Sequence, residues 1–415
     1  MMPKLISALG FGVMLGLAWL LSEDRKRIRV RLIVTGLLLQ LIFALLILKT
    51  TPGRIIFGTL AQFVNGVIAC GKEGSTFLFG EGFQEHYFAF SVLPLIVFFS
   101  CVTAVLFYWG VIQVIVKALA WSMVRVMDVS GSESLAAAAN IFIGHTEAPL
   151  LVRPYLESMT RSEITAMLTG GMATISGSVM AAYVGLGVDA GHLLAASIMS
   201  APASLVVAKV MVPEREVSPT KGEVRVEVPR QGRNVIDAAC HGAGIGLKLA
   251  LNVGAMVLAF VSLIALINWG LERGQFLVLS LINGADTAGE LTQTTPLTFQ
   301  RIMGWLFCPF AWIMGIQRED VLKISALLGE RTVLNEFIAY VDLVKLRDQV
   351  DPRSFTIATY ALCGFANFGS IAIQIGGIGS LVPGRREDIA QLSLRSMIGG
   401  TLGAFMTACI VGILI

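Results

Sequence analysis

Charge is scarce in this chain. Only 14% of its 415 residues are Asp, Glu, Lys or Arg, while 55% are hydrophobic. Soluble globular domains carry about 25% charged and 45–50% apolar residues. The mean hydropathy is correspondingly high, at +0.76. Most side chains must therefore face lipid or other buried helices, which excludes an ordinary soluble domain and predicts a membrane protein.

Several functional motifs are also missing. The net charge is only +3, and Lys and Arg form no long run, so the electrostatic pattern of a nucleic-acid-binding protein is absent. There is no HExxH motif and no pair of cysteines at metal-ligand spacing. The cysteines lie mostly in apolar stretches and are predicted to be small buried side chains: Cys70, Cys101, Cys240, Cys308, Cys363 and Cys409.

What the chain has in abundance is apolar segments long enough to cross a bilayer, which takes about 20 residues. The first of them is followed by a charged segment and no cleavage site, which favours a transmembrane helix over a signal peptide. Two of them, Phe88–Val116 and Ile164–Val188, contain no charged residue. The predicted spans are Leu5–Leu21, Leu32–Leu48, Phe88–Val116, Ile164–Val188, Ala190–Ala208, Leu249–Leu271, Phe355–Val382 and Leu392–Ile415.

The basic residues of short loops predict the orientation, because such loops stay in the cytoplasm. Five Lys and Arg residues in Ser22–Arg31 place the first loop inside and both termini outside. The charged, proline-containing linker Pro213–Asn234 also falls inside and separates two halves of similar layout. The alternation closes only if two further stretches, near 134–158 and 297–345, enter the membrane and return on the same side.

Each of these two stretches carries a carboxylate within apolar sequence. Glu147 lies between Gly144 and Pro149, and Glu336 follows Asn335. Irregular backbone at membrane depth is tolerated only where it lines protein or a water-filled cavity. The sequence therefore predicts two re-entrant helical hairpins, the first with a run of alanines that allows close packing.

Each predicted hairpin is followed by a helix with a polar, glycine-containing middle, Leu168–Val179 in the first half and Leu362–Ala372 in the second. Interrupted segments at matching positions of two halves indicate a transporter's binding site. A buried Glu costs at least about 2.5–3.5 kcal/mol, which favours function, although a structural ion pair is an alternative. Asn367 and Ser370 could instead join helices, and Arg331 could pair with Glu336 or lie on the surface.

Three ordered motifs resemble the concentrative nucleoside transporter family. They are Gly144–Pro149 after Asn140, Gly329-x-Arg331 with Asn335–Tyr340, and Gly364–Ser370, and the likeness covers nearly the whole chain. The resemblance implies an all-α polytopic membrane protein with eight transmembrane helices and two re-entrant hairpins in an inverted repeat. It further implies a homotrimer, with a scaffold subdomain and a transport subdomain that moves as an elevator.

On this layout the chain divides into four parts. Residues 1–116 hold the N-terminal scaffold helices, and residues 117–212 the first transport repeat with its hairpin near 134–158. Residues 213–295 hold the cytoplasmic linker, an interfacial helix and a scaffold helix. Residues 296–415 form the second transport repeat, with its hairpin near 297–345.

The resemblance also implies the site. His145, Thr146 and Glu147 would face the nucleobase of a nucleoside such as uridine, with Val179 and Phe365 as apolar and aromatic walls. The ribose hydroxyls would bind three further side chains, for which a carboxylate, an amide and a hydroxyl are suitable partners: Glu336, Asn367 and Ser370.

A sodium ion is the implied coupling ion, and it would drive nucleoside uptake across the plasma membrane, or the inner membrane of a bacterium. Side-chain and backbone oxygens at the end of a half-helix suit such a hard cation. The implied ligands are Asn140, Ile143, Thr174 and Ile175.

Two residues depart from the family pattern, which usually has Gln at His145 and Lys at Arg331. Imidazole titrates near neutral pH, so uptake is predicted to depend on pH more steeply than in a Gln-bearing relative.

Proton coupling through Glu147 or His145 is the alternative to sodium. A remote alternative is an intramembrane hydrolase built on Ser176, Ser178 and His145, but it leaves Glu336 without a role; the chain is predicted not to be an enzyme.

Overall fold

The computed structural model describes residues 2–82, 88–222, 232–283 and 296–415. Within these ranges the chain is helical, and its β-type pairing is one isolated bridge between Ser130 and Lys221. Eight helices of the described part are long and apolar enough to cross a membrane. The predicted all-α polytopic fold is thus confirmed.

Two of the N-terminal helices lie where the hydropathy predicted them, α1 (Met2–Leu20) and α2 (Val30–Lys49). A third, α3 (Thr51–Phe79), was not predicted, because Lys and Glu residues interrupt its apolar sequence. Its start is nevertheless marked locally: the hydroxyl of Thr50 accepts a hydrogen bond from the Gly53 amide at 3.0 Å, which is an ordinary N-cap.

The predicted span Phe88–Val116 is wrong as a single helix. A π-helical turn at Phe88–Val92 leads into helix α4 (Leu93–Tyr108), which ends before Gly110. A separate helix, α5 (Val111–Met127), begins after Gly110. The φ angle of Gly110 is +83°, a left-handed conformation that costs a glycine little. The chain therefore changes direction inside an uninterrupted apolar run, which hydropathy alone cannot show.

The rest of the first half has a helix–turn–helix followed by a broken helix. The turn joins α6 (Gly131–Ala139) to α7 (Ala148–Leu151). The broken helix consists of α8 (Arg161–Ala173) and α9 (Gly177–Gly185), and α10 (Ala190–Met211) follows. The predicted break within Leu168–Val179 is confirmed at residues 174–176.

The second half repeats this order of elements. Helix α13 is followed by a helix–turn–helix, then by a helix that breaks at residues 363–367, and finally by a long helix. The predicted break within Leu362–Ala372 is therefore confirmed as well, whereas re-entry of the two helix–turn–helix units into the membrane stays a prediction. The elements are α13 (Phe299–Ile313), α14 (Val321–Val333), α15 (Glu336–Lys345), α16 (Pro352–Leu362), α17 (Phe368–Leu381) and α18 (Arg386–Leu414).

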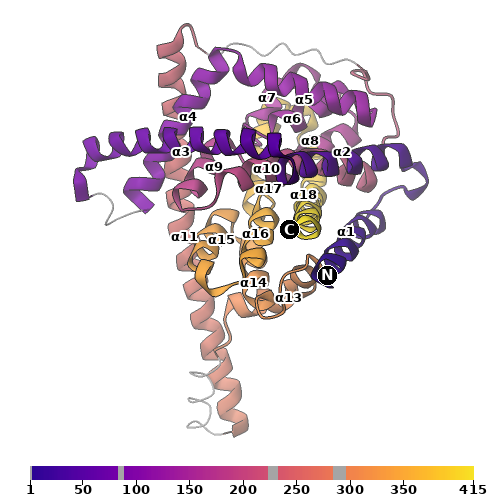
Figure 1. Ribbon diagram of the computed structural model, residues 1–415. Coiled ribbons are helices and arrows are strands. Elements are labelled where there is room, and N and C mark those ends of the chain that lie inside the picture. Colours follow the sequence, from indigo (N-terminus) through magenta and orange to yellow (C-terminus); the bar gives the residue numbers. More distant parts are fainter. Residues whose placement is uncertain (1, 83–87, 223–231, 284–295) are drawn as a thin grey trace.

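Between the halves stands α11 (Val235–Asn283), a single helix of 49 residues and much longer than the predicted span Leu249–Leu271. The described part of 213–295 contains no separate interfacial helix. In Figure 1, α11 is a long rod whose lower part projects beyond the other helices, and α3 extends to one side. The apolar windows of α3 and α11 are each only 11% buried, against 94% for α10.

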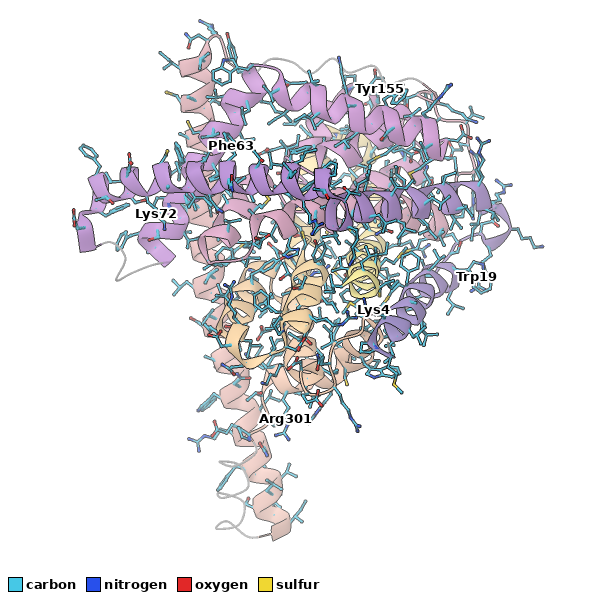
Figure 2. All side chains as sticks on the ribbon, viewed as in Figure 1. Lys4, Trp19, Phe63, Lys72, Tyr155 and Arg301 are labelled. Carbon is cyan, nitrogen blue, oxygen red and sulfur yellow. The ribbon has the colours of Figure 1, made fainter. Side chains whose placement is uncertain are left out.

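Side chains on these peripheral helices point away from the bundle. Figure 2 shows Lys72 toward the projecting end of α3, Phe63 farther along that helix, and Trp19 on α1 at the right-hand edge of the view. Phe63 and Trp19 are exposed. The prediction of buried cysteines is wrong for Cys70 and Cys240, which are exposed on α3 and α11. Helices α8, α10 and α18 instead pack against one another and form the centre of the protein.

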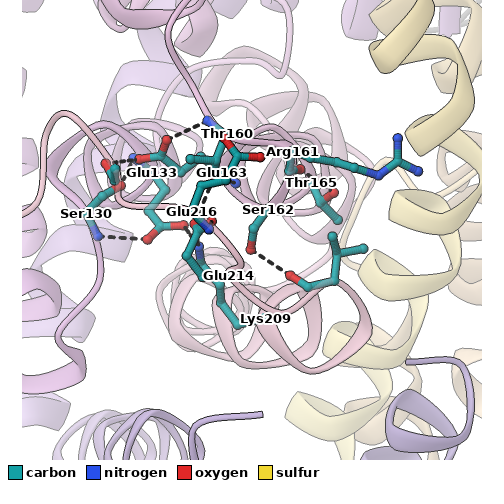
Figure 3. A network of polar contacts seen from close by, with 12 residues as sticks. Ser130, Glu133, Thr160, Arg161, Ser162, Glu163, Thr165, Lys209, Glu214 and Glu216 are labelled. Carbon is teal, nitrogen blue, oxygen red and sulfur yellow. Dashed lines mark hydrogen bonds and ion pairs between the residues drawn. The ribbon is translucent and has the colours of Figure 1, made fainter. Parts of the chain in front are cut away.

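A buried polar network fixes the base of the first helix–turn–helix (Figure 3). Helices α6 and α8 both begin with a capping box, Ser130 with Glu133 and Thr160 with Glu163. The Nζ of Lys209, near the end of α10, lies 2.6 Å from Glu133 Oε2 and 3.1 Å from a carboxylate oxygen of Glu214. Because buried charges must be paired, this network joins the start of α6, the start of α8 and the end of α10.

Candidate substrate and cation site

A cavity of about 360 Å³ lies between the two turns, the two helix breaks and one face of α11. Its volume is within the usual range for small-molecule sites, about 300–1,000 Å³. All eight predicted substrate-binding residues line it: His145, Thr146, Glu147, Val179, Glu336, Phe365, Asn367 and Ser370. The structure thus brings together side chains from three motifs that are far apart in the sequence.

The carboxylate of Glu336 is fixed at one end of this cavity. Glu336 is the first residue of α15, and Asn335 caps that helix by accepting a hydrogen bond from the Ile338 amide at 3.0 Å. A carboxylate is favourable at a helix N-terminus. Tyr183 donates its hydroxyl hydrogen to Glu336 Oε1, and Asn367 Nδ2 donates to Oε2, both at 2.9 Å. Glu336 is therefore held in one orientation, with acceptor capacity left for a ligand.

The break in the second half places Asn367 and Ser370 beside this carboxylate. The Asn367 side-chain oxygen accepts a hydrogen bond from the Ser370 amide at 2.8 Å and so caps α17. The Asn367 amide group remains directed at Glu336. Both residues line the cavity, and Asn367 also joins the break to α15 through Glu336.

The opposite wall is apolar and aromatic. The ring of His145 meets Phe365 edge-on, with centroids 4.8 Å apart and planes at 78°, and Val179 lies in the same wall. The His145 side chain is buried, and among the described residues neither ring nitrogen has a hydrogen-bond partner. These residues offer an apolar and aromatic surface to a ring-shaped ligand, while both His145 nitrogens are themselves buried.

The serines of the hydrolase alternative have other contacts. Ser176 and Ser178 lie 3.4 Å apart, oxygen to oxygen, and Ser176 caps α9 by accepting from the Val179 amide. His145 makes no hydrogen bond to either serine. A nucleophilic serine needs a base within hydrogen-bond reach, so the geometry does not support this alternative.

Two of the four predicted cation ligands lie in the first turn, Asn140 and Ile143, and two at the first break, Thr174 and Ile175. Gly177 N donates to the Phe142 carbonyl at 2.9 Å and joins the turn to α9. The side chains of Asn140, Ile143, Thr174 and Ile175 are all buried. Asn140 Oδ1 has no hydrogen-bond partner in the described part of the chain, and Thr174 Oγ1 donates to the Gly170 carbonyl at 2.9 Å.

These oxygens fit a hard cation. A buried carbonyl oxygen without a partner is costly and calls for a ligand. The Thr174 hydroxyl keeps its lone pairs, because its hydrogen is already donated. Thr174 is also the C-cap of α8, where the helix dipole is negative.

The structure adds residues that the sequence did not single out. Tyr183 binds Glu336 from within an apolar helix, where a single tyrosine gives no distinguishing signal. Helix α11 contributes Lys248, Asn252 and Met256 to the cavity, and of these a polar Asn252 in an apolar span could have been noticed. Arg331 is fully buried, so its interpretation as a surface group is wrong.

Three family models match consecutive parts of this chain. The model described as Na+ dependent nucleoside transporter N-terminus matches residues 9–82, and the C-terminus model of that name matches residues 192–412. A model described as Gate, nucleoside recognition, matches residues 89–189.

Named relatives agree with these models. Solute carrier family 28 member 3 of Mus musculus is 41% identical over 99% of this chain, and sodium/nucleoside cotransporter 1 of the same species is 38% identical over 99%. The chain spans only 59% and 64% of these two proteins. An uncharacterized transporter of Haemophilus influenzae is 42% identical over the full chain and 98% of its own length.

A solved structure has the same fold. The structure of CNTnw in an inward-facing substrate-bound state superposes with a TM-score of 0.89 at 41% identity, covering 99% of this chain and 97% of that one. A variant of CNTnw in an outward-facing state gives 0.90 at 40% identity.

Proposed function

This chain belongs to the Na+ dependent, or concentrative, nucleoside transporter family, and from that premise we propose that it is a sodium-coupled symporter that takes nucleosides into the cell. The family consists of multi-pass membrane transporters rather than enzymes, and its description names Na+ as the ion on which transport depends. The substrate, the coupling ion of this chain and its assembly belong to the proposal.

One observation carries the proposal: seven residues of three distant motifs, together with Val179, line a single cavity. In it, Glu336, Asn367 and Ser370 would bind the ribose hydroxyls. Vicinal hydroxyls donate to a carboxylate and accept from an amide, and the Glu336–Asn367 pair offers both. An uncharged nucleoside needs such dense hydrogen bonding because no net charge helps to hold it.

The base would lie against the wall of Val179, Phe365 and His145. Aromatic and apolar side chains supply contact area for a flat ring. Thr146 and Glu147, which also line the cavity, would provide polar contacts to the base. Because His145 replaces the usual Gln, it offers an imidazole in place of a paired carbonyl and amide.

Sodium would bind to Asn140 and Thr174 through their side chains and to Ile143 and Ile175 through their backbone carbonyls. The proposed ion and base sites share the 140–147 turn, so an ion that orders this turn would also order His145, Thr146 and Glu147. Such a shared element couples two ligands in both directions. The proton alternative, through Glu147 or His145, gives no role to the unpaired Asn140 oxygen.

Transport would proceed by an elevator-type movement of the two helix–turn–helix units with their broken helices, relative to a scaffold that includes α3 and α11. The cavity is lined by both halves and by α11, so it lies at the proposed boundary between moving and fixed parts. The proposed assembly is a homotrimer with both termini outside, in the plasma membrane.

The test is radiolabelled uridine uptake into proteoliposomes, with imposed sodium and proton gradients compared. We expect an inward sodium gradient to drive accumulation and a proton gradient alone to have little effect. Glu336→Gln should abolish uptake, because a neutral amide cannot replace the double acceptor. Accumulation driven only by protons would refute the sodium assignment, and failure to take up any nucleoside would refute the proposed function.

A further inference from the structure

The two broken helices meet at their breaks. Phe365 N donates to the Thr174 carbonyl at 3.3 Å, and a β-carbon at Gly364 would lie 2.7 Å from the Met172 carbonyl oxygen. The C-terminal ends of α8 and α16 are therefore close together. Each such end carries a partial negative charge of about half an electron, and both lie in the protein interior, where that charge needs a cation.

In the second half, a side chain supplies that cation. Arg331 on α14 is 0% exposed, and its Nη1 donates to the Ala361 carbonyl, in the last turn of α16, at 2.6 Å. Its guanidinium carbon lies 5.7 Å from the ring centre of Phe405. Nε and Nη2 have no hydrogen-bond partner among the residues that the structure describes.

The same guanidinium compensates the ribose-binding carboxylate. Arg331 lies in the last turn of α14 and Glu336 at the start of α15, so the two opposite charges stand on either side of the same short turn, and both side chains are buried. Each half thus has one carboxylate facing the cavity, Glu147 or Glu336. Each half also has one cation position at the end of a broken helix, formed by the Asn140–Thr174 oxygens in the first half and by Arg331 in the second. A buried charge without compensation is strongly unfavourable.

We propose that Arg331 is a tethered cation: its guanidinium takes, at the end of α16, the place that the coupling ion takes at the end of α8. It positions Glu336 and the α16 terminus and makes an external ion unnecessary in the second half. This inference rests on the proposed sodium coupling, and it predicts that removing the guanidinium leaves a carbonyl end that an added sodium ion can occupy.

The test measures thermal unfolding of the purified protein in detergent, with sodium chloride or an equal concentration of choline chloride. The variants are Arg331→Gln, Arg331→Lys and, as a matched control, Lys209→Gln, which neutralises the buried cation of the Glu133 network. We expect Arg331→Gln to unfold at a lower temperature in choline. Sodium should then raise its melting temperature by about twice the parent's increase, because a second bound ion adds a second stabilising increment.

The lysine variant should behave as the parent does, because it keeps the charge. Lys209→Gln should lose stability but keep the parent's response to sodium. Equal sodium responses in the parent and Arg331→Gln would overturn the proposal, as would a lysine variant that matches the glutamine variant. If sodium does not stabilise even the parent, the proposed sodium site itself fails, so the two failures are distinguishable.

A double variant covers the case in which Arg331→Gln does not fold. Arg331→Gln combined with Glu336→Gln removes both charges, so it should yield folded protein even where Arg331→Gln does not, and it should have the higher melting temperature where both variants fold. Coupling of this kind is what a double-mutant cycle measures. A double variant that is less stable than Arg331→Gln, or losses that simply add, would mean that the two charges do not compensate each other.

Discussion

Glu336 accepts hydrogen bonds from side chains of both halves of the chain, and Tyr183 supplies the one from the first half. Tyr183→Phe removes only the hydroxyl and leaves Oε1 without that donor. A hydrogen bond to a charged group contributes about 1.5–3 kcal/mol, and about 1.4 kcal/mol is a factor of ten. We expect the KM for uridine uptake to rise about tenfold or more, with a smaller change in maximal rate.

Tyr360→Phe is the matched control for Tyr183→Phe. The Tyr360 hydroxyl lies 3.0 Å from His192 Nδ1, and Tyr360 does not line the cavity. Tyr360→Phe should therefore leave the KM for uridine uptake unchanged. Equal effects of the two substitutions would show that Tyr183 acts only through general packing.

Thr174 tests the cation site through a single oxygen. Thr174→Val keeps the shape of the side chain and removes the hydroxyl, so we expect the sodium concentration for half-maximal uptake to rise about tenfold, consistent with the loss of one charge-assisted contact. Uridine KM at saturating sodium should change little. Thr169→Val is the control, because Thr169 is buried on the same helix; a similar loss of sodium affinity in both would contradict the assignment.

His145 tests the departure from the family pattern. Protonation of the His145 ring would add a positive charge beside the proposed base site, and the ring nitrogens have no acceptor among the described residues to stabilise it. We expect uridine uptake at a fixed sodium gradient to fall as the medium is acidified, and His145→Gln to flatten that fall. His192→Gln is the control, because His192 lies outside the cavity; a profile unchanged by His145→Gln would contradict this prediction.

Much of the site was predictable because polar residues stand out in apolar sequence. Glu147, Glu336 and Asn367 each interrupt a hydrophobic segment, and the motif resemblance gave each a role. Tyr183 carried no such signal, since an aromatic residue in a membrane helix is ordinary. The position of Arg331 could not be decided from the sequence either, because burial depends on α16 and Phe405, which are distant along the chain.

At the scale of elements, the contact between the two breaks depends on Gly364. Its φ angle is +145°, which favours glycine strongly, and a β-carbon there would collide with the Met172 carbonyl. We expect Gly364→Ala to abolish most uridine uptake and to lower the melting temperature. Gly376→Ala on α17 is the control, because a β-carbon at Gly376 meets nothing within 4 Å; equal losses would show that the break tolerates a side chain.

The first and last residues of a helix were predictable only where the chain changes direction and the sequence becomes less apolar at the same point. The ends of α1 and α2 coincide with charged residues, and both were predicted well. The turn at Gly110 lies within apolar sequence, and the left-handed glycine that produces it leaves no trace in a hydropathy profile. The reverse holds for α3, where charged residues hide a continuous helix, and for α11, whose ends lie beyond its most apolar part.

At the scale of the whole molecule, two long apolar helices, α3 and α11, are the least covered of the candidate membrane spans in the described part of the chain. Helices α3 and α11 project beyond the bundle (Figure 1), and their exposed side chains include Phe77 and Leu281. Lipid can cover such side chains, so exposure alone does not define an assembly. Small residues mark closer approaches between helices, and a β-carbon at Gly66 of α3 or Gly270 of α11 meets nothing within 4 Å in the single chain.

The proposed trimer can therefore be tested on these glycines. Native mass spectrometry in detergent should give about three times the 44.5 kDa of one chain. A side chain at Gly66 or Gly270 has open space at its β-carbon in the isolated chain, whereas a leucine there would obstruct a neighbouring helix of the proposed trimer. Gly66→Leu and Gly270→Leu should therefore reduce the trimer fraction. A β-carbon at Gly12 of α1 also meets nothing within 4 Å, and Gly12→Leu should leave the trimer fraction unchanged. A single-chain mass that accompanies full uridine uptake would show that each chain transports alone, because the cavity and both breaks are complete within one copy.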